Sequence, residues 1–149
     1  MMAIPWNMEG TSRVIRQTKE LLVIHTNSNW YTGGAHPISM EYYHNYDLKT
    51  HKKLSLDDVC EKDYAQKLLA VAEKQFRKNE HLADTTKLDD ASGYFFENGK
   101  FLLNDNFMLT EKGLLFLWNV YEIKSYAEGV TTLEIPFEDL KGILRKEYF

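Results

Sequence analysis

The residues best suited to chemistry in this 149-residue sequence gather in residues 30–37, WYTGGAHP. Paired glycines suit a phosphate cradle, and a histidine suits a base or a metal ligand. However, the segment has neither the GxxxxGK[ST] nor the GxGxxG pattern, and no helix start follows it. Glycine pairs also serve turns and bulges. We therefore interpret the pair mainly as a turn, with Tyr31, Thr32 and His36 as candidate ligand-binding side chains.

A carboxylate, Glu122, is the second candidate, in residues 120–129, VYEIKSYAEG, directly after the most apolar stretch. A partly buried acid here would pair with a tyrosine hydroxyl or a backbone amide, and we favour that structural role. Glu122 and His36 are also the best acid and base available for an enzyme that acts on glycans. No GxSxG motif or Ser/His/Asp signature is present. We therefore assign no catalytic residue.

The sequence gives little support for a metal site or for a reactive thiol. The five histidines show no HxH or HxxxH spacing, and a zinc site needs three or four convergent ligands. Cys60 is the only cysteine, so no intrachain disulfide forms. Its place near a predicted helix start would lower its pKa, although a buried apolar role is favoured. We expect no metal and no cofactor.

Composition excludes several classes of protein. The net charge is −4, and the only dense basic groups, residues 49–53 and 74–78, lie beside acidic residues, so we expect no nucleic-acid partner. The longest apolar run, residues 114–118, is far too short to span a bilayer. Aromatic residues make up 13% of the chain, which hints at a binding surface.

The elements that would position these residues follow from local patterns. Residues 21–26 and 39–48 are β-branched or alternating, and we predict that they pair as a long antiparallel hairpin. The pattern of residues 54–79 predicts one long helix, with a capping box at Ser55 and Asp58 and bases in its last turns. Its buried stripe is predicted to be Tyr64, Leu68, Val71, Ala72 and Phe76.

The second half predicts further strands. Residues 80–99 are interpreted as a loop with a short strand near 93–97. Residues 107–110 and 114–119 form a second hairpin, in which Gly113 takes a positive φ and residues 114–119 form a covered central strand. Residues 130–135 form the last strand, and Pro136 opens a short C-terminal helix. The order predicts an α+β domain, with both helices packed on one antiparallel sheet.

Several motifs, in order, carry a resemblance to a known family. The chain resembles a bacterial extracytoplasmic domain of unknown function, which forms the C-terminal part of the extracellular region of the lysozyme-sensing anti-sigma factor RsiV. That domain also occurs in polysaccharide deacetylases and lipoproteins of the cell envelope. The matching segments are YTGGAH at 31–36, DLKT at 47–50 with Leu54, Leu56 and Asp58, GLLF at 113–116, YEI at 121–123 with Tyr126, Ala127 and Gly129, and IP at 135–136 with Leu140.

The chain departs from the family pattern at three places. His51 replaces the glycine that follows DLxT, so we expect that turn to be built differently. Lys124 and Ser125 replace Ala-Pro, which is expected to loosen a rigid loop. Phe137 replaces a tyrosine and loses one hydroxyl. We expect residues 1–149 to form one domain of this type, with residues 1–20 a remnant of an upstream segment.

The resemblance implies an exported protein, periplasmic or on the cell surface. No signal peptide is visible in MMAIPWNMEG, so we expect that an export signal was removed. We predict a non-catalytic binding or sensing domain whose partner is a protein such as lysozyme or a cell-wall glycan. The predicted contact residues are Tyr31, Thr32, His36, Tyr121, Glu122 and Tyr126. The alternatives are an enzyme or auxiliary module for cell-wall glycans, and a structural module that oligomerises through a sheet edge.

Overall fold

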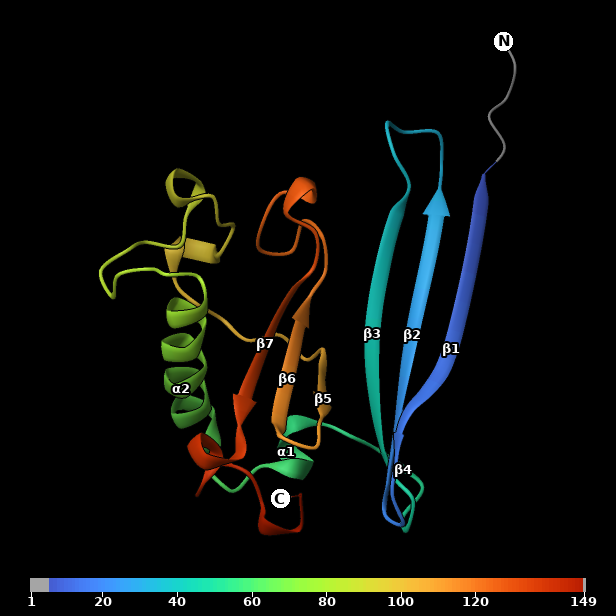
Figure 1. Ribbon diagram of the computed structural model, residues 1–149, viewed down its shortest axis with the longest axis vertical. Coiled ribbons are helices and arrows are strands. Elements are labelled where there is room, and N and C mark those ends of the chain that lie inside the picture. The colour runs from blue at the N-terminus through green and yellow to red at the C-terminus, as the bar shows by residue number, and fades with distance from the viewer. Residues whose placement is uncertain (1–5, 149) are drawn as a thin grey trace.

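The protein is an α+β domain with two antiparallel sheets, seen here in a computed structural model that describes residues 6–148 (Figure 1). The first sheet has the order β1-β2-β3-β4 and the second the order β5-β6-β7. The strands are β1 Asn7–Gln17, β2 Leu21–Tyr31, β3 Ile38–Asp47, β4 Lys52–Leu54, β5 Phe107–Leu109, β6 Gly113–Trp118 and β7 Thr131–Pro136. The helices are α1 Leu56–Val59 and α2 Tyr64–Asn79. Short 3-10 turns cover Asp90–Ser92, Glu97–Gly99, Tyr126–Glu128, Phe137–Leu140 and Lys146–Tyr148.

The predicted fold class is confirmed, but the strands form two sheets instead of one. The hairpin of β2 and β3 pairs from Leu21↔Asp47 to Trp30↔Ile38. The second sheet lies between this hairpin and α2, with β7 toward the helix and β5 toward β3 (Figure 1). β6 is the central strand of its sheet, as its apolar sequence predicts.

The core lies where α2 meets the second sheet and the segment of residues 94–101. The ring of Phe76 on α2 lies 5.0 Å from that of Phe101 and 6.1 Å from that of Trp118, measured between centroids. The rings of Tyr94 and Phe96 contact Phe76 edge-on. Edge-to-face aromatic packing adds to the stability gained by burial. A loop that the sequence shows as polar therefore supplies much of the aromatic core.

Asparagine side chains join the two sheets along β3. β4 covers only the end of β3, from Asn45 to Asp47, which leaves the backbone of Glu41 and Tyr43 without a strand neighbour on that side. Asn119 accepts the N–H of Glu41 at 2.7 Å, and Asn106 accepts the N–H of Tyr43 at 2.9 Å. Both asparagines also donate to the carbonyl of Glu41. A side-chain amide has the donor and acceptor of a peptide group, so these residues replace a missing strand.

The predicted long helix is broken between α1 and α2. The capping box is present, because Asp58 accepts the N–H of Ser55 at 2.8 Å and its hydroxyl at 2.6 Å. At Cys60 the chain leaves the helix and bridges to Leu144, and the N–H of Glu61 bonds to the carbonyl of Ile143. Pairing with the C-terminal segment thus replaces the helical hydrogen bonds. In α2, Leu68, Ala72 and Phe76 are buried as predicted, while Tyr64 and Val71 are half-buried.

Four further expectations are corrected. Residues 93–97 form no strand, and 3-10 turns flank them instead. Gly113 lies inside β6 without a positive φ. Pro136 ends β7, and the 3-10 turns Phe137–Leu140 and Lys146–Tyr148 follow it in place of a C-terminal helix. Residues 7–17, to which no element was assigned, form β1 along the whole of β2.

Candidate functional site

The candidate site is a stack of three rings from two loops that are far apart in sequence. His36 lies in the loop between β2 and β3, and Tyr121 and Tyr126 lie in the loop between β6 and β7. The His36 and Tyr126 rings are stacked, with centroids 3.7 Å apart and planes 19° apart. The ring of Tyr121 lies 5.6 Å from that of Tyr126 and 6.3 Å from that of His36. We call His36, Tyr121 and Tyr126 the ring stack.

Hydrogen bonds fix the tautomer of His36 and the orientation of the stack. His36 Nδ1 lies 3.1 Å from the carbonyl oxygen of Pro37, which can only accept, so Nδ1 carries the proton. In the neutral ring Nε2 is then the acceptor, and the hydroxyl of Tyr121 donates to it at 3.2 Å. The hydroxyl of Tyr126 donates to the same Pro37 carbonyl at 3.1 Å. The three rings are therefore held in one arrangement before any ligand binds.

The turn that carries Tyr121 is held by Glu122. The carboxylate of Glu122 accepts the N–H of Asn119 at 3.0 Å and the side-chain amide of Asn104 at 3.1 Å. Tyr121 itself has a φ of 68°, in the left-handed region that non-glycine residues rarely adopt. The structure thus gives the exposed carboxylate of Glu122 a backbone-amide partner, as predicted for a structural acid. The carboxylate of Glu122 therefore hydrogen-bonds to Asn119 and Asn104, and not to His36.

Lys124 anchors this loop to the end of α2. Its ammonium lies 2.6 Å from the carboxylate of Glu80 and 5.4 Å from the centroid of the Tyr94 ring. The hydroxyl of Tyr94 donates to the same carboxylate at 2.8 Å, and the pKa of Tyr94 is raised, first by burial and then by Glu80. The replacement of Ala-Pro by Lys-Ser therefore adds a tether where a looser loop was expected. No sequence signal pairs Lys124 with Glu80, because 44 residues separate them.

The remaining predicted site residues have other surroundings. The hydroxyl of Tyr31 donates to the carbonyl of Gly34 at 2.9 Å and closes its own loop. Gly33 has a φ of 95°, so the glycine pair does build the turn. Thr32 is exposed in that loop. The structure thus brings together three of the six predicted residues, His36, Tyr121 and Tyr126.

Cys60 is placed differently from the expectation of a lowered pKa. It follows the last turn of α1, is 1% exposed, and burial raises the pKa of its thiol to about 12. Its surroundings therefore keep it as an unreactive thiol. Within residues 6–148, no three histidine, cysteine, aspartate or glutamate side chains lie close enough to hold a metal ion. In the same residues no helix is long and apolar enough to cross a membrane.

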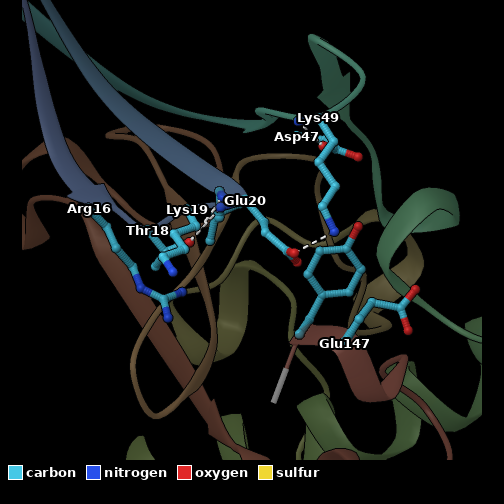
Figure 2. Close-up of a pocket in the computed structure, with 9 residues that line it drawn as sticks. Arg16, Thr18, Lys19, Glu20, Asp47, Lys49 and Glu147 are labelled. Carbon is cyan, nitrogen blue, oxygen red and sulfur yellow. Dashed lines mark hydrogen bonds and ion pairs between the residues drawn. The ribbon is translucent and has the colours of Figure 1, made fainter.

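A polar cleft of about 660 Å³ lies at the opposite end of β2 from the loop that carries His36 (Figure 2). Its lining includes three cationic and three anionic side chains, Arg16, Lys19, Lys49, Glu20, Asp47 and Glu147. Several of these are already engaged, since Lys49 pairs with Glu20 and Arg16 donates to the carbonyl of Leu109 at 2.9 Å. The N–H groups of Thr50 and Lys49 lower the pKa of Asp47. With balanced charges, the cleft favours neither an anion nor a cation.

The fold and the ring stack thus define a small α+β domain that presents an ordered aromatic surface. Residues 57–138 match the family described as "Protein of unknown function (DUF3298)", and this match covers more than half of the chain. The chain belongs to the DUF3298 family.

Relatives of known name and structure agree with this assignment. The chain is 27% identical over 139 residues to the peptidoglycan-N-acetylmuramic acid deacetylase PdaC of Bacillus subtilis, and covers 29% of that protein. A DUF3298 structure from Bacteroides fragilis is 34% identical, with a TM-score of 0.83, over 95% of this chain and 55% of that one. A DUF3298 structure from Pseudomonas aeruginosa is 24% identical, with a TM-score of 0.77, over 97% of this chain and 64% of that one. The resemblance to RsiV stays a prediction.

Proposed function

We propose that this chain is a non-catalytic, extracytoplasmic binding domain of a bacterial cell-envelope protein, and that the ring stack contacts the glycan of the cell wall. The observation that carries the proposal is the stack itself. Three rings with polar edges meet where the β2–β3 and β6–β7 loops come together, and Tyr121 is 51% exposed. Flat rings of this kind cover the apolar face of a sugar, while their hydroxyl and imidazole groups bond to its hydroxyls.

The order of the site before binding supports a binding role. Pro37 holds two of the rings, Glu122 holds the turn of Tyr121, and Lys124 ties the loop to α2. Side chains fixed in advance lose less conformational entropy when a ligand binds. The carboxylate of Glu122 bonds to the N–H of Asn119 in its own turn and to the side-chain amide of the distant Asn104, with no hydrogen bond to His36, which supports a non-catalytic role.

The choice of a cell-wall glycan is supported by PdaC. That relative is named as a deacetylase of peptidoglycan N-acetylmuramic acid, and the matched region is 29% of its length. A domain attached to an enzyme of the cell wall lies outside the cytoplasm, next to peptidoglycan. This chain is therefore proposed to act at the same place and on the same polymer, as a contact module.

The proposal is tested by calorimetric titration of the chain with soluble muropeptides. We expect saturable binding, and we expect Tyr126→Ala to weaken it about tenfold because one stacked ring is lost. Tyr121→Phe keeps the ring and removes the hydroxyl, so it should weaken binding less. The matched control is Tyr42→Ala, which removes an exposed tyrosine of β3 outside the stack and should bind normally.

Two parallel measurements separate the alternatives. Titration with C-type lysozyme tests a protein partner, and lysozyme binding without muropeptide binding would overturn the glycan assignment. Mass spectrometry of the muropeptides after long incubation tests for turnover. Products that vanish in Glu122→Gln or His36→Ala would show catalysis, and the non-catalytic role would then be wrong.

A further inference from the structure

β1 is a long and open sheet edge. Among residues 6–148 it pairs only with β2, and ten of its eleven residues are exposed (Figure 1). Between Met8 and Val14 the pairing with β2 is regular, and the bulge begins only after Val14. This stretch contains no proline and no lysine, the residues that most often protect an edge strand from another chain. The open edge can therefore accept a further strand.

The direction of each backbone group along β1 follows from the other strands. In β3, the N–H groups of Glu41 and Tyr43 bond to asparagines of the second sheet, so odd-numbered residues face away from β2. Directions alternate along a strand. The β2–β3 register, and the β1–β2 register up to Val14, pair odd-numbered residues with odd and even with even. The backbone groups that face the open edge are therefore those of Met8, Gly10, Ser12 and Val14.

We propose that this edge binds a second copy of the chain, with the two β1 strands antiparallel and a two-fold axis at Thr11. This register places Met8 opposite Val14 and Gly10 opposite Ser12, and all four residues direct their backbone groups to the edge. The dimer would form about eight hydrogen bonds, two for each hydrogen-bonded pair. Thr11 is also the midpoint of the regular stretch that ends at Val14.

The side chains of β1 complement themselves in this register. Glu9 lies opposite Arg13 of the second copy, and the two-fold axis repeats the pair, so opposite charges meet twice on one face of the sheet. On the other face Met8, 74% exposed, covers Val14, 55% exposed. A shift by two residues in either direction places Glu9 opposite Thr11 or Ile15 and loses both matches. This self-complementarity favours a second copy over an unrelated strand.

The interface is independent of the proposed glycan contact, because the strand edge and the ring stack share no residue. It is tested by sedimentation equilibrium over a range of protein concentrations. We expect the mass to rise from monomer to dimer. A monomer at every concentration up to about 200 μM would overturn the proposal.

Charge reversal tests the register. Glu9→Arg sets two arginines opposite each other in each pair, and Arg13→Glu sets two glutamates opposite each other, so each variant alone should dimerise at least about tenfold more weakly. In an equimolar mixture of the two variants, one chain carries arginine at positions 9 and 13 and the other carries glutamate at both. Each mixed dimer therefore sets an arginine of one chain opposite a glutamate of the other at both pairs. The mixture should therefore dimerise like the parent chain. A dimer that ignores these changes, or a mixture that stays monomeric, would contradict the register.

Ser12→Pro gives a second and separate test. The N–H of Ser12 faces the open edge, so proline removes a donor from the dimer without removing one from the β1–β2 ladder. We expect this variant to stay monomeric with an unchanged circular dichroism spectrum. A Ser12→Pro dimer of parental affinity would show that another surface is used.

Discussion

His51 adopts a backbone conformation that is unfavourable for its side chain. Its φ is 58°, and it lies exposed in the turn between β3 and β4. The resemblance described above places a glycine at this position, and a positive φ is the conformation that glycine adopts at least cost. A Cβ in the left-handed region raises the energy of the folded chain, and glycine removes this penalty.

His51→Gly is therefore expected to raise the free energy of unfolding by about 0.5–1 kcal/mol, after the greater flexibility of glycine in the unfolded chain is subtracted. Urea denaturation measures the change. His51→Ala is the control, because it removes the imidazole and keeps the Cβ, so it should not stabilise the protein. Equal stabilisation by alanine would show that the imidazole, and not the backbone, is the cause.

Gly113 is required for close contact between β6 and β7. A Cβ at this position would lie 1.9 Å from the carbonyl oxygen of Ile135, a backbone atom that cannot move away alone. Gly113→Ala is expected to lower the free energy of unfolding by about 3 kcal/mol or more, or to prevent folding. Gly34→Ala is the control, since its Cβ meets nothing within 4 Å, and it should change stability by less than about 0.5 kcal/mol. Normal stability of Gly113→Ala in thermal denaturation would contradict this packing.

At the scale of elements, the join between the sheets depends on buried asparagines. Asn45 is 1% exposed and bridges β3 to β5, because its side chain donates to the carbonyl of Phe107 at 2.8 Å and accepts the N–H of Leu109 at 3.0 Å. Asn45→Ala is expected to lower the free energy of unfolding by about 2–4 kcal/mol, since two buried backbone groups lose their partners. Asn29→Ala, an exposed asparagine of β2, should change it by less than about 0.5 kcal/mol in the same urea titration. A small loss of stability in Asn45→Ala would contradict this role, because it would mean that water bonds to the Phe107 carbonyl and the Leu109 N–H in place of Asn45.

The start of α1 makes stability depend on pH. The side-chain and then the backbone hydrogen bond from Ser55 lower the pKa of Asp58 below its ordinary value of 3.8. Because the pKa of Asp58 is lower in the folded chain than in the unfolded chain, its carboxylate stabilises the fold at pH values above the ordinary pKa. This contribution is lost as the pH falls through the folded-state pKa. Asp58→Ala should therefore cost about 0.5–1 kcal/mol at neutral pH, and the difference from the parent should shrink below pH 3.8. A difference that is constant in acid would contradict the assignment.

At the scale of the whole molecule, the thiol of Cys60 reports unfolding. It is buried between α1 and the C-terminal segment, and burial raises its pKa from 9.0 to about 12, so almost no thiolate exists in the folded chain at about pH 8. We expect a thiol reagent to leave the native protein unmodified and to react at the rate of unfolding in urea. Rapid labelling of the folded chain would show that the C-terminal segment opens locally.

Part of the candidate site could be predicted from the sequence, and part of it could not. The sequence predicts residues of the segments 30–37 and 120–129 as the contact surface, and His36, Tyr121 and Tyr126 from those segments do meet. The contacts that hold these rings could not be predicted from the sequence. Lys124 and Glu80 are distant in sequence, and they pair only because α2 packs beside the loop that carries Lys124. The backbone-amide partner expected for Glu122 is present in Asn119, although Glu122 is exposed and not partly buried as predicted.

The sequence by itself determined the features that rest on local chemistry. Alternation predicted the β2–β3 hairpin, the capping box predicted the start of α1, and apolar residues on both faces predicted that β6 is central. Only the tertiary structure decided the separation into two sheets, the break at Cys60 and the pairing of β1. These three features share one physical reason: in each, backbone N–H and C=O groups bond to partners that are far away in the sequence. Asparagines complete β3, the C-terminal segment takes the hydrogen bonds at Cys60, and β2 orders the exposed β1.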